Sequence, residues 1–244
     1  MIEIDNLTKS YGNFTAVNQI SFSVAPGEIF GFLGVNGAGK TTTLKMLAGV
    51  LKPSSGKIKI CEYDMAKEPE KAKSVTGYIP DRPYIYNKLT GREFLYFVSD
   101  LYMVKEKEAE NKINSLLEEY GLVDWQDELV ESYSHGMKQR LATCAALVHQ
   151  PRVLIVDEPM VGLDPHGAKF LKEAFRRYAD EGMSILLSTH SLNVAEEVAD
   201  RLAIIHKGSI IAIGTLENIK SAAGNAEIRL EDMFLKLTAG AMTN

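Results

Sequence analysis

The sequence predicts an α/β fold, because apolar strand-like segments alternate along the chain with segments of helical pattern. The 244 residues are 45% hydrophobic and 24% charged, which is an ordinary globular composition with enough apolar residues for one large domain or two small lobes. The predicted strands cover residues 2–7, 20–24, 28–33, 57–60, 77–80, 153–157, 184–188, 202–206 and 210–213.

The middle of the chain has a different pattern from the two ends. From residue 90 to about residue 120 the apolar side chains recur at helical spacing, with Glu and Lys between them. Gly121 then follows as a typical helix stop. These observations predict a helical lobe, at about 88–150, that is inserted into the α/β core.

The strand predicted at 28–33 leads into a loop with a specific pattern. Residues 34–41 (GVNGAGKT) match G-x-x-x-x-G-K-[ST] without a gap, and a helix is predicted to follow at 42–50. Glycine lets the backbone turn sharply, so that successive N–H groups form a nest for an anion beside the positive end of the helix. Strand, loop and helix in this order predict a site for the phosphates of a nucleotide rather than a chance glycine-rich turn.

Different residues of this loop are expected to bind different groups. Lys40 is expected to reach the β- and γ-phosphates of ATP, and the Thr41 hydroxyl is expected to hold Mg²⁺. The candidate nucleotide-binding residues of the loop are Asn36, Gly37, Ala38, Gly39, Lys40, Thr41 and Thr42.

A second strand ends in two carboxylates. The apolar run at 153–157 is typical of a strand buried on both faces, and ligands of open α/β sheets bind at the carboxyl ends of such strands. Asp157 is expected to support Mg²⁺, directly or through water, and Glu158 to polarise the attacking water. The alternative is a strand that runs into a charged turn, but its position after a phosphate loop favours the catalytic interpretation.

Composition excludes several other classes of function. The net charge is −5 and no block is dense in Lys and Arg, which argues against a nucleic-acid-binding face. We find no apolar run long enough to span a membrane and no signal peptide. Cys61 and Cys144 match no metal or redox spacing and are predicted to be buried thiols of a cytoplasmic protein.

Four further segments make the pattern specific. Residues 133–140 (YSHGMKQR) resemble the signature motif of ATP-binding cassette (ABC) proteins, commonly L-S-G-G-Q, and they precede the strand at 153–157 as in that family. Residues 162–164 (GLD) resemble the family's D-loop, His190 its switch histidine, and Tyr11 the aromatic that stacks on adenine. The order of these segments over about 1–220 resembles an ATP-binding subunit of an ABC transporter.

The resemblance implies an architecture and two cofactors. The fold would be a P-loop NTPase core with a mixed sheet, an antiparallel β subdomain and the inserted α-helical lobe. The ATPase domain would cover 1–220, and a C-terminal tail with a short helix would cover 221–244. ATP and Mg²⁺ would be bound, and two copies of the chain would enclose two ATP molecules.

The resemblance also implies a role for each remaining candidate. The signature residues would contact the ATP held by the second copy; they are Ser134, His135, Gly136 and Met137, at the start of a helix that runs to about residue 148. Asp164 would act in the D-loop, and His190 would hydrogen-bond the γ-phosphate and orient Glu158 or the water. Each has a structural alternative: Ser134 can cap its helix, His190 can be an ordinary structural residue, and Tyr11 can pack on the core.

Three departures from the family pattern stand out. Asp81 occupies the position of the usual Gln of the Q-loop; it can reach Mg²⁺, but an ionised carboxylate cannot donate a hydrogen bond as an amide can. His135 and Met137 replace a glycine and the Gln of the signature, and Val161 stands where a Ser often precedes Gly-Leu-Asp. Similar variants occur in bacterial exporter-type subunits of the family.

These observations predict a cytoplasmic ATPase, held on the inner face of the cell membrane by a separate multi-spanning permease. Residues 230–238 resemble the tail of the exporter subset for drugs, antibiotics and polysaccharides, which favours export. The alternatives are a soluble assembly ATPase of the iron–sulfur-cluster type, a DNA-repair or chromosome ATPase, and a catalytically idle regulator. The permease is expected to dock on 80–87, which contain Tyr84 and Tyr86, and on the apolar segments 94–98 and 101–103, unless these side chains only form the core of the lobe.

Overall fold

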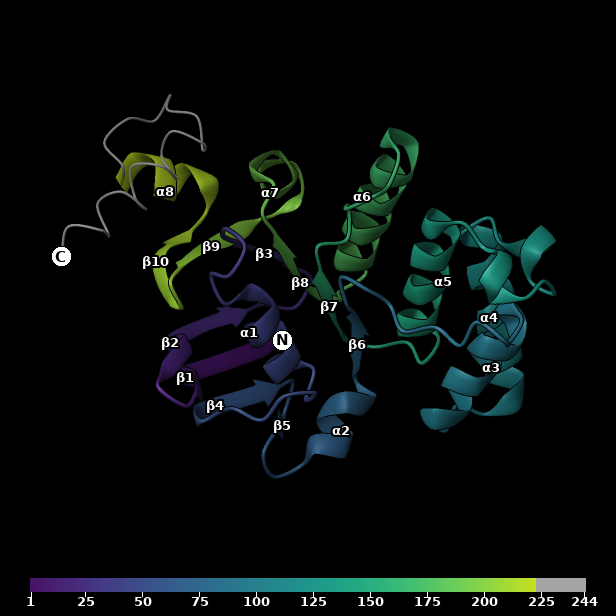
Figure 1. Cartoon of the computed structure of the whole chain (residues 1–244), viewed down its shortest axis with the longest axis horizontal. Helices are drawn as coiled ribbons and strands as arrows, with labels where there is room; N and C mark the ends of the chain where they lie inside the picture. Colours follow the sequence, from purple (N-terminus) through teal and green to yellow (C-terminus); the bar gives the residue numbers. More distant parts are fainter. Residues whose placement is uncertain (223–244) are drawn as a thin grey trace.

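The computed structural model describes residues 1–222, which form two β-sheets and a set of helices (Figure 1). The strands are β1 (Ile2–Tyr11), β2 (Phe14–Val24), β3 (Ile29–Leu33), β4 (Ser55–Ile60), β5 (Tyr63–Asp64), β6 (Thr76–Ile79), β7 (Val153–Asp157), β8 (Ser184–Thr189), β9 (Arg201–His206) and β10 (Ser209–Gly214). The α-helices are α1 (Lys40–Leu47), α2 (Pro69–Ser74), α3 (Gly91–Leu101), α4 (Glu106–Glu119), α5 (His135–Leu147), α6 (Pro165–Asp180), α7 (Leu192–Val198) and α8 (Leu216–Ala222), with 3₁₀ turns at Val123–Trp125 and Val130–Ser132.

The central sheet has six strands in the order β10-β9-β3-β8-β7-β6. β9, β3, β8, β7 and β6 run parallel, whereas β10 pairs antiparallel with β9, so the sheet is mixed as expected. The register places Leu33 opposite Thr189 and Asp157 opposite Ser188. The segments that follow β3, β7 and β8 therefore leave the sheet side by side, at the carboxyl ends of these strands.

The second sheet is antiparallel, with the strand order β2-β1-β4-β5. Its buried side chains face the central sheet, where the rings of Phe22 and Phe30 stack with centroids 5.0 Å apart. Helix α1 contributes Leu44 and Leu47 to the same core. The antiparallel subdomain expected from the sequence is thus packed against the part of the chain that carries the phosphate loop.

The helical lobe lies at the far end of the molecule from the antiparallel sheet (Figure 1). Helix α3 begins with a complete capping box, in which the Thr90 hydroxyl accepts from the Glu93 N–H and the Glu93 carboxylate accepts from the Thr90 N–H. The lobe joins the core through Tyr120, which is 1% exposed and whose hydroxyl lies 3.3 Å from that of Tyr178 on α6. Two apolar clusters, one on each side, cover the faces of the central sheet.

Several boundaries differ from the predicted ones, for local reasons. Helix α1 starts at Lys40 and ends at Leu47 rather than spanning 42–50, because Gly49 has φ +66° and ends the helical path. β1 extends to Tyr11 through polar residues that give no apolar pattern. The helix expected in the tail beyond 222, and the segment 230–238, lie outside the described residues.

Burial in the sheet generates a prediction about stability. Leu186, at the centre of β8, is fully buried among the residues between the two sheets, so Leu186→Ala should lower the free energy of unfolding by about 2–5 kcal/mol. Leu101→Ala makes the same chemical change at a side chain that is 65% exposed and should cost less than about 0.5 kcal/mol. Urea unfolding followed by circular dichroism measures both; equal losses would contradict the assigned core.

Candidate functional site

The loop at 34–41 connects β3 to α1 and has the backbone that phosphate binding requires. Gly37 and Gly39 have φ values of +81° and +111°, which side chains rarely allow. A Cβ on Gly39 would lie 2.6 Å from the carbonyl oxygen of Ala16, so the space for a side chain is also absent. The Gly34 N–H donates to the Thr189 carbonyl at 3.3 Å and fixes the start of the loop against β8.

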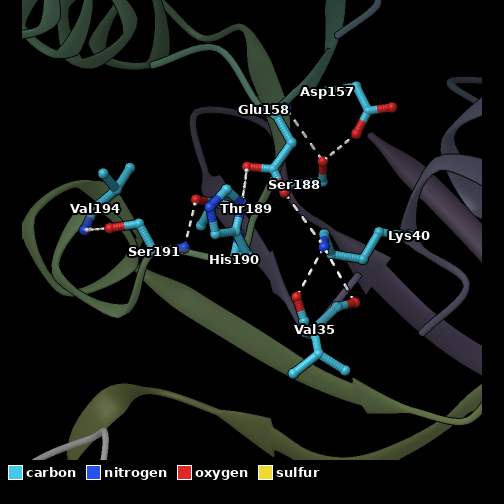
Figure 2. A network of polar contacts seen from close by, with 10 residues as sticks. Val35, Lys40, Asp157, Glu158, Ser188, Thr189, His190, Ser191 and Val194 are labelled. Carbon is cyan, nitrogen blue, oxygen red and sulfur yellow. Dashed lines mark hydrogen bonds and ion pairs between the residues drawn. The ribbon is translucent and has the colours of Figure 1, made fainter. Parts of the chain in front are cut away.

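Lys40 is 5% exposed, and its ammonium lies inside the curl of this loop (Figure 2). It donates to the Gly34 carbonyl oxygen at 2.7 Å and forms an ion pair with Glu158 Oε1 at 3.2 Å. The buried ammonium is thus paired with a carboxylate and hydrogen-bonded by the loop. Incoming phosphate oxygens would therefore compete with Glu158 for this charge.

The two acidic residues at the end of β7 are held by the neighbouring strand β8, Asp157 through its carboxylate and Glu158 through its backbone N–H. Asp157 is fully buried, and its Oδ1 accepts from the Ser188 hydroxyl at 2.5 Å. The Glu158 N–H donates to the Ser188 carbonyl at 3.1 Å, and Glu158 itself has φ +51°, an uncommon conformation for a residue with a side chain. Backbone strain of this kind is found at functional sites and directs Glu158 away from the strand path.

Glu158 also contacts the predicted switch histidine. Glu158 Oε2 lies 2.9 Å from His190 Nδ1 and accepts from the His190 N–H at 3.3 Å (Figure 2). The Glu158 side chain is 11% exposed and that of His190 is 51% exposed. Glu158 thus lies between Lys40 and His190, so the three residues named as catalytic candidates form one connected group.

A pocket of 350 Å³ collects most of the predicted nucleotide-binding residues. Tyr11 enters from β1 and is 50% exposed, with its ring available to a planar partner. Asp81 enters from the loop after β6. The predicted residues that line the pocket are Tyr11, Asn36, Gly37, Gly39, Lys40, Thr41, Thr42, Asp81 and Glu158.

Ala38 is the one predicted loop residue that the pocket lining lacks. Its side chain is 2% exposed, and its N–H donates to the Val35 carbonyl at 3.1 Å. In this conformation Ala38 shapes the loop, and its methyl group packs in the core between the two sheets.

The residues expected to support Mg²⁺ fit a divalent cation. Asp157 Oδ2 is buried and has no hydrogen-bond partner within residues 1–222, so it is an oxygen ligand in need of a positive or polar neighbour. Thr41 and Asp81 line the adjoining pocket. Within residues 1–222, no group of three or more acidic, His or Cys residues forms a metal cluster by itself.

The signature residues lie elsewhere. Ser134 and Gly136 line a separate hollow of 560 Å³ together with Asp164, and no residue of the phosphate loop borders it. The Ser134 hydroxyl accepts from the Met137 N–H at 3.3 Å, and Asp164 Oδ1 accepts from the Gly167 N–H at 2.8 Å. Both side chains therefore cap helices, as the structural alternative for Ser134 predicts, while remaining exposed to a partner.

The departures in the signature segment are explained by packing. A Cβ on Gly162 would lie 2.9 Å from His135 Nε2, so the imidazole is in contact with the backbone of the D-loop. The Met137 side chain is 8% exposed and packs in the hydrophobic core. Val161 is 48% exposed, on the surface beside Gly162.

An apolar groove of 370 Å³ lies between β6, the end of α1 and the lobe. Its lining includes Pro83 and Tyr84 from the predicted docking segment, and Tyr84 is 99% exposed. Tyr102 also lines it and stacks on His149, whose pKa burial lowers to about 4, so that the imidazole is neutral. Tyr86 lies outside the lining, 60% exposed, with its ring edge-on to Phe97.

Two contributors were missed by the sequence analysis. The Ser188 hydroxyl donates to the Asp157 carboxylate and accepts from the Glu158 N–H, and a polar residue at the end of an apolar strand was the available signal. Phe14 lines the nucleotide pocket beside Tyr11 and is 65% exposed. An exposed aromatic at the start of a strand gave no pattern that distinguished it from a surface residue.

Comparisons with known proteins show the family to which this fold belongs. The linearmycin resistance ATP-binding protein LnrL of Bacillus subtilis (strain 168) is 39% identical over 99% of this chain and 76% of its own length. A solved structure described as the ATP binding subunit of an ABC transporter superposes with a TM-score of 0.92, at 34% identity, over 98% of this chain and 99% of that one. The dimeric post-hydrolysis structure of the cassette MJ0796 with ADP and Pi has a TM-score of 0.80 at 21% identity, over 88% and 99% of the two chains, and shows the shared fold.

The family profile described as ABC transporter matches residues 17–161, which include the phosphate loop, the signature segment and both carboxylates of β7. Among the described helices, none has the length and apolar character needed to cross a bilayer. The chain belongs to the ABC transporter family and is an ATP-binding, ATP-hydrolysing cassette.

Proposed function

We propose that two copies of this chain close head to tail on two ATP molecules and that this closure drives a separate membrane permease. The observation that supports the dimer is that the predicted site residues of one copy line two separate hollows. Lys40 and Glu158 line one hollow, whereas Ser134, Gly136 and Asp164 line another. A second copy would bring its signature residues to the ATP held on the phosphate loop of the first; the structural neighbour MJ0796 is described as a dimer.

The residues of the pocket have distinct tasks in this proposal. Lys40 binds the phosphates after exchanging its ion pair with Glu158 for them, and Tyr11 stacks on the adenine. Thr41, Asp157 and Asp81 would hold Mg²⁺, which supplies charge neutralisation on the phosphates when bound. Once released from Lys40, Glu158 accepts the proton of the attacking water, and His190 keeps the carboxylate oriented.

The permease would dock in the apolar groove beside β6. We assign this occupant because the chain belongs to a family of transporter cassettes and because the groove exposes aromatic and apolar side chains, which are enriched where proteins meet. The loop after β6 carries both the groove residue Tyr84 and the pocket residue Asp81. This shared loop gives a direct connection between the permease and the nucleotide.

Export is the proposed direction, supported by the similarity to LnrL, whose name describes resistance to an antibiotic. The proposed place is the cytoplasmic face of the cell membrane, bound to the permease, with 1–220 as the ATPase domain and 221–244 as its tail. Isolation of the chain with a multi-spanning membrane protein would support this proposal. Isolation with soluble cluster-assembly proteins would instead favour the assembly ATPase.

The role of Glu158 generates a prediction about the dimer. Glu158→Gln should retain ATP binding but hydrolyse ATP about 10²–10⁴-fold more slowly, because the amide cannot accept the proton of the water. Slow hydrolysis should trap a dimer with Mg-ATP on size-exclusion chromatography. Glu110→Gln, at an exposed position of α4, is the control and should behave like the parent. A Glu158→Gln protein that stays monomeric at high concentration would contradict the two-copy mechanism.

Asp81 generates a prediction about turnover. If Asp81 contacts the metal and the water, Asp81→Ala should reduce kcat more than it reduces ATP affinity, because the phosphate loop still binds the nucleotide. Asp81→Gln restores the usual family residue and should keep substantial activity. Steady-state ATPase kinetics and direct ATP titration separate the two quantities. Parent-like hydrolysis by both variants would remove Asp81 from the proposed site.

The groove generates a prediction about the permease. Tyr84→Ala should weaken co-purification with the permease from detergent-solubilised membranes, because the fully exposed ring is a contact available for burial. Tyr84→Phe keeps the ring and should retain the association. Trp125→Ala removes another exposed aromatic of the lobe, one that does not line the groove, and serves as the control. Equal recovery of the permease with all variants would refute this docking site.

A further inference from the structure

Tyr78, in the middle of β6, has a buried hydroxyl that the site described above does not use. Its oxygen is shielded from solvent and has no hydrogen-bond partner within the described part of the chain. A buried phenol without a partner is costly, so such a group requires an explanation in terms of a neighbour, a water or an ion.

The strand register shows which residues the hydroxyl faces. Tyr78 pairs with Ile155 in the parallel ladder between β6 and β7, and both pack in the core between the two sheets. Side chains alternate along a strand, so Asp157 projects from the same face as Ile155, one step nearer the carboxyl end. Tyr78 and Asp157 therefore share the face of the sheet that α1 covers.

A second unpartnered oxygen lies on this face. Asp157 Oδ1 is held by Ser188, but Oδ2 is buried without a partner among residues 1–222. Burial and the nearby carboxylates of Asp157 and Asp81 raise the pKa of Tyr78 well above its usual value. The phenol is a hydrogen-bond donor on the same face of the sheet as this unpartnered acceptor.

We propose that Tyr78 is a positioning residue for Asp157, in which the phenol O–H holds Oδ2 through one bridging water. A water is the partner that suits two buried polar atoms that do not reach each other directly. With Ser188 on Oδ1 and the water held by Tyr78 on one lone pair of Oδ2, the carboxylate keeps one orientation and still has a lone pair for Mg²⁺. This inference rests on the role proposed above for Asp157.

The same ring connects the metal side of the site to the apolar groove. Tyr78 lines the groove together with Tyr84 and Phe94, so the ring that holds Asp157 also forms part of the surface offered to the permease.

Tyr78→Phe tests the proposal, because it removes the hydroxyl and keeps the ring. The full chain is titrated with a fluorescent ATP analogue, first in EDTA and then at increasing Mg²⁺. We expect parent-like binding of the analogue in EDTA and a roughly tenfold higher Mg²⁺ concentration at half effect, the scale measured for lost partners of metal ligands. The Mg²⁺ dependence of ATP hydrolysis should shift by the same factor.

Tyr178→Phe is the matched control, since it removes a buried phenol hydroxyl from α6 on the far side of the core. It should leave the Mg²⁺ dependence unchanged, whatever its effect on thermal stability. Parent-like Mg²⁺ dependence of Tyr78→Phe would overturn the proposal. A loss of analogue binding in EDTA by the same factor would also overturn it, because the effect would then be general rather than directed at the metal.

Asp157→Asn separates this inference from the proposed function. If Asp157→Asn keeps the parent Mg²⁺ dependence, the metal role of Asp157 is wrong and the proposal for Tyr78 falls with it. If Asp157→Asn is impaired and Tyr78→Phe is not, only the inference about Tyr78 fails. In the double variant, Tyr78→Phe should add no further loss, because its effect acts through the carboxylate.

Discussion

Three adjacent parallel strands, β3, β8 and β7, end side by side in the central sheet, and the positions of Lys40, the acidic pair and His190 depend on that register. Leu33 opposite Thr189 and Asp157 opposite Ser188 bring the phosphate loop, the acidic pair and His190 together from segments far apart in the chain. These strands are apolar and buried on both faces, so a shift by one residue would move charged side chains into the core. The packing of the sheet therefore also determines which charged groups meet at the carboxyl ends of its strands.

At these strand ends, Lys40 and Glu158 form an ion pair with each other. The pair is largely buried, and removing one partner would leave an uncompensated charge. Phosphate oxygens can replace the carboxylate of Glu158 at Lys40, and the released carboxylate still has His190 at 2.9 Å to orient it. In this proposal, the binding of ATP at Lys40 and the release of Glu158, the proposed general base, occur in the same step.

The sequence was sufficient for the parts of the fold that have a local signal. Strands β3 and β7 were predicted to within one residue, because strands buried on both faces are continuous apolar runs. The phosphate loop and the acidic pair were found from residue types that their chemistry requires. The short elements β5 and α2 were missed because they have too few residues for periodicity, and α6 was missed although Asp164 and Pro165 form a typical helix start. Ser188 and the role proposed for Tyr78 could not be assigned, because both depend on cross-strand neighbours that only the register reveals.

The same register explains how a groove on the surface can be linked to a buried carboxylate without a moving domain. β6 is the edge strand of the central sheet, so one of its sides pairs with β7 and the other faces the loop and lobe that form the groove. Tyr78 extends from this strand into the core. The strand ends at Ile79, and Asp81 follows two residues later. A partner that presses on the groove therefore acts on a short, rigid strand whose residues lie beside Asp157 and the nucleotide pocket. Because protein interiors are close-packed, such a strand offers a route by which the proposed partner would affect Asp157.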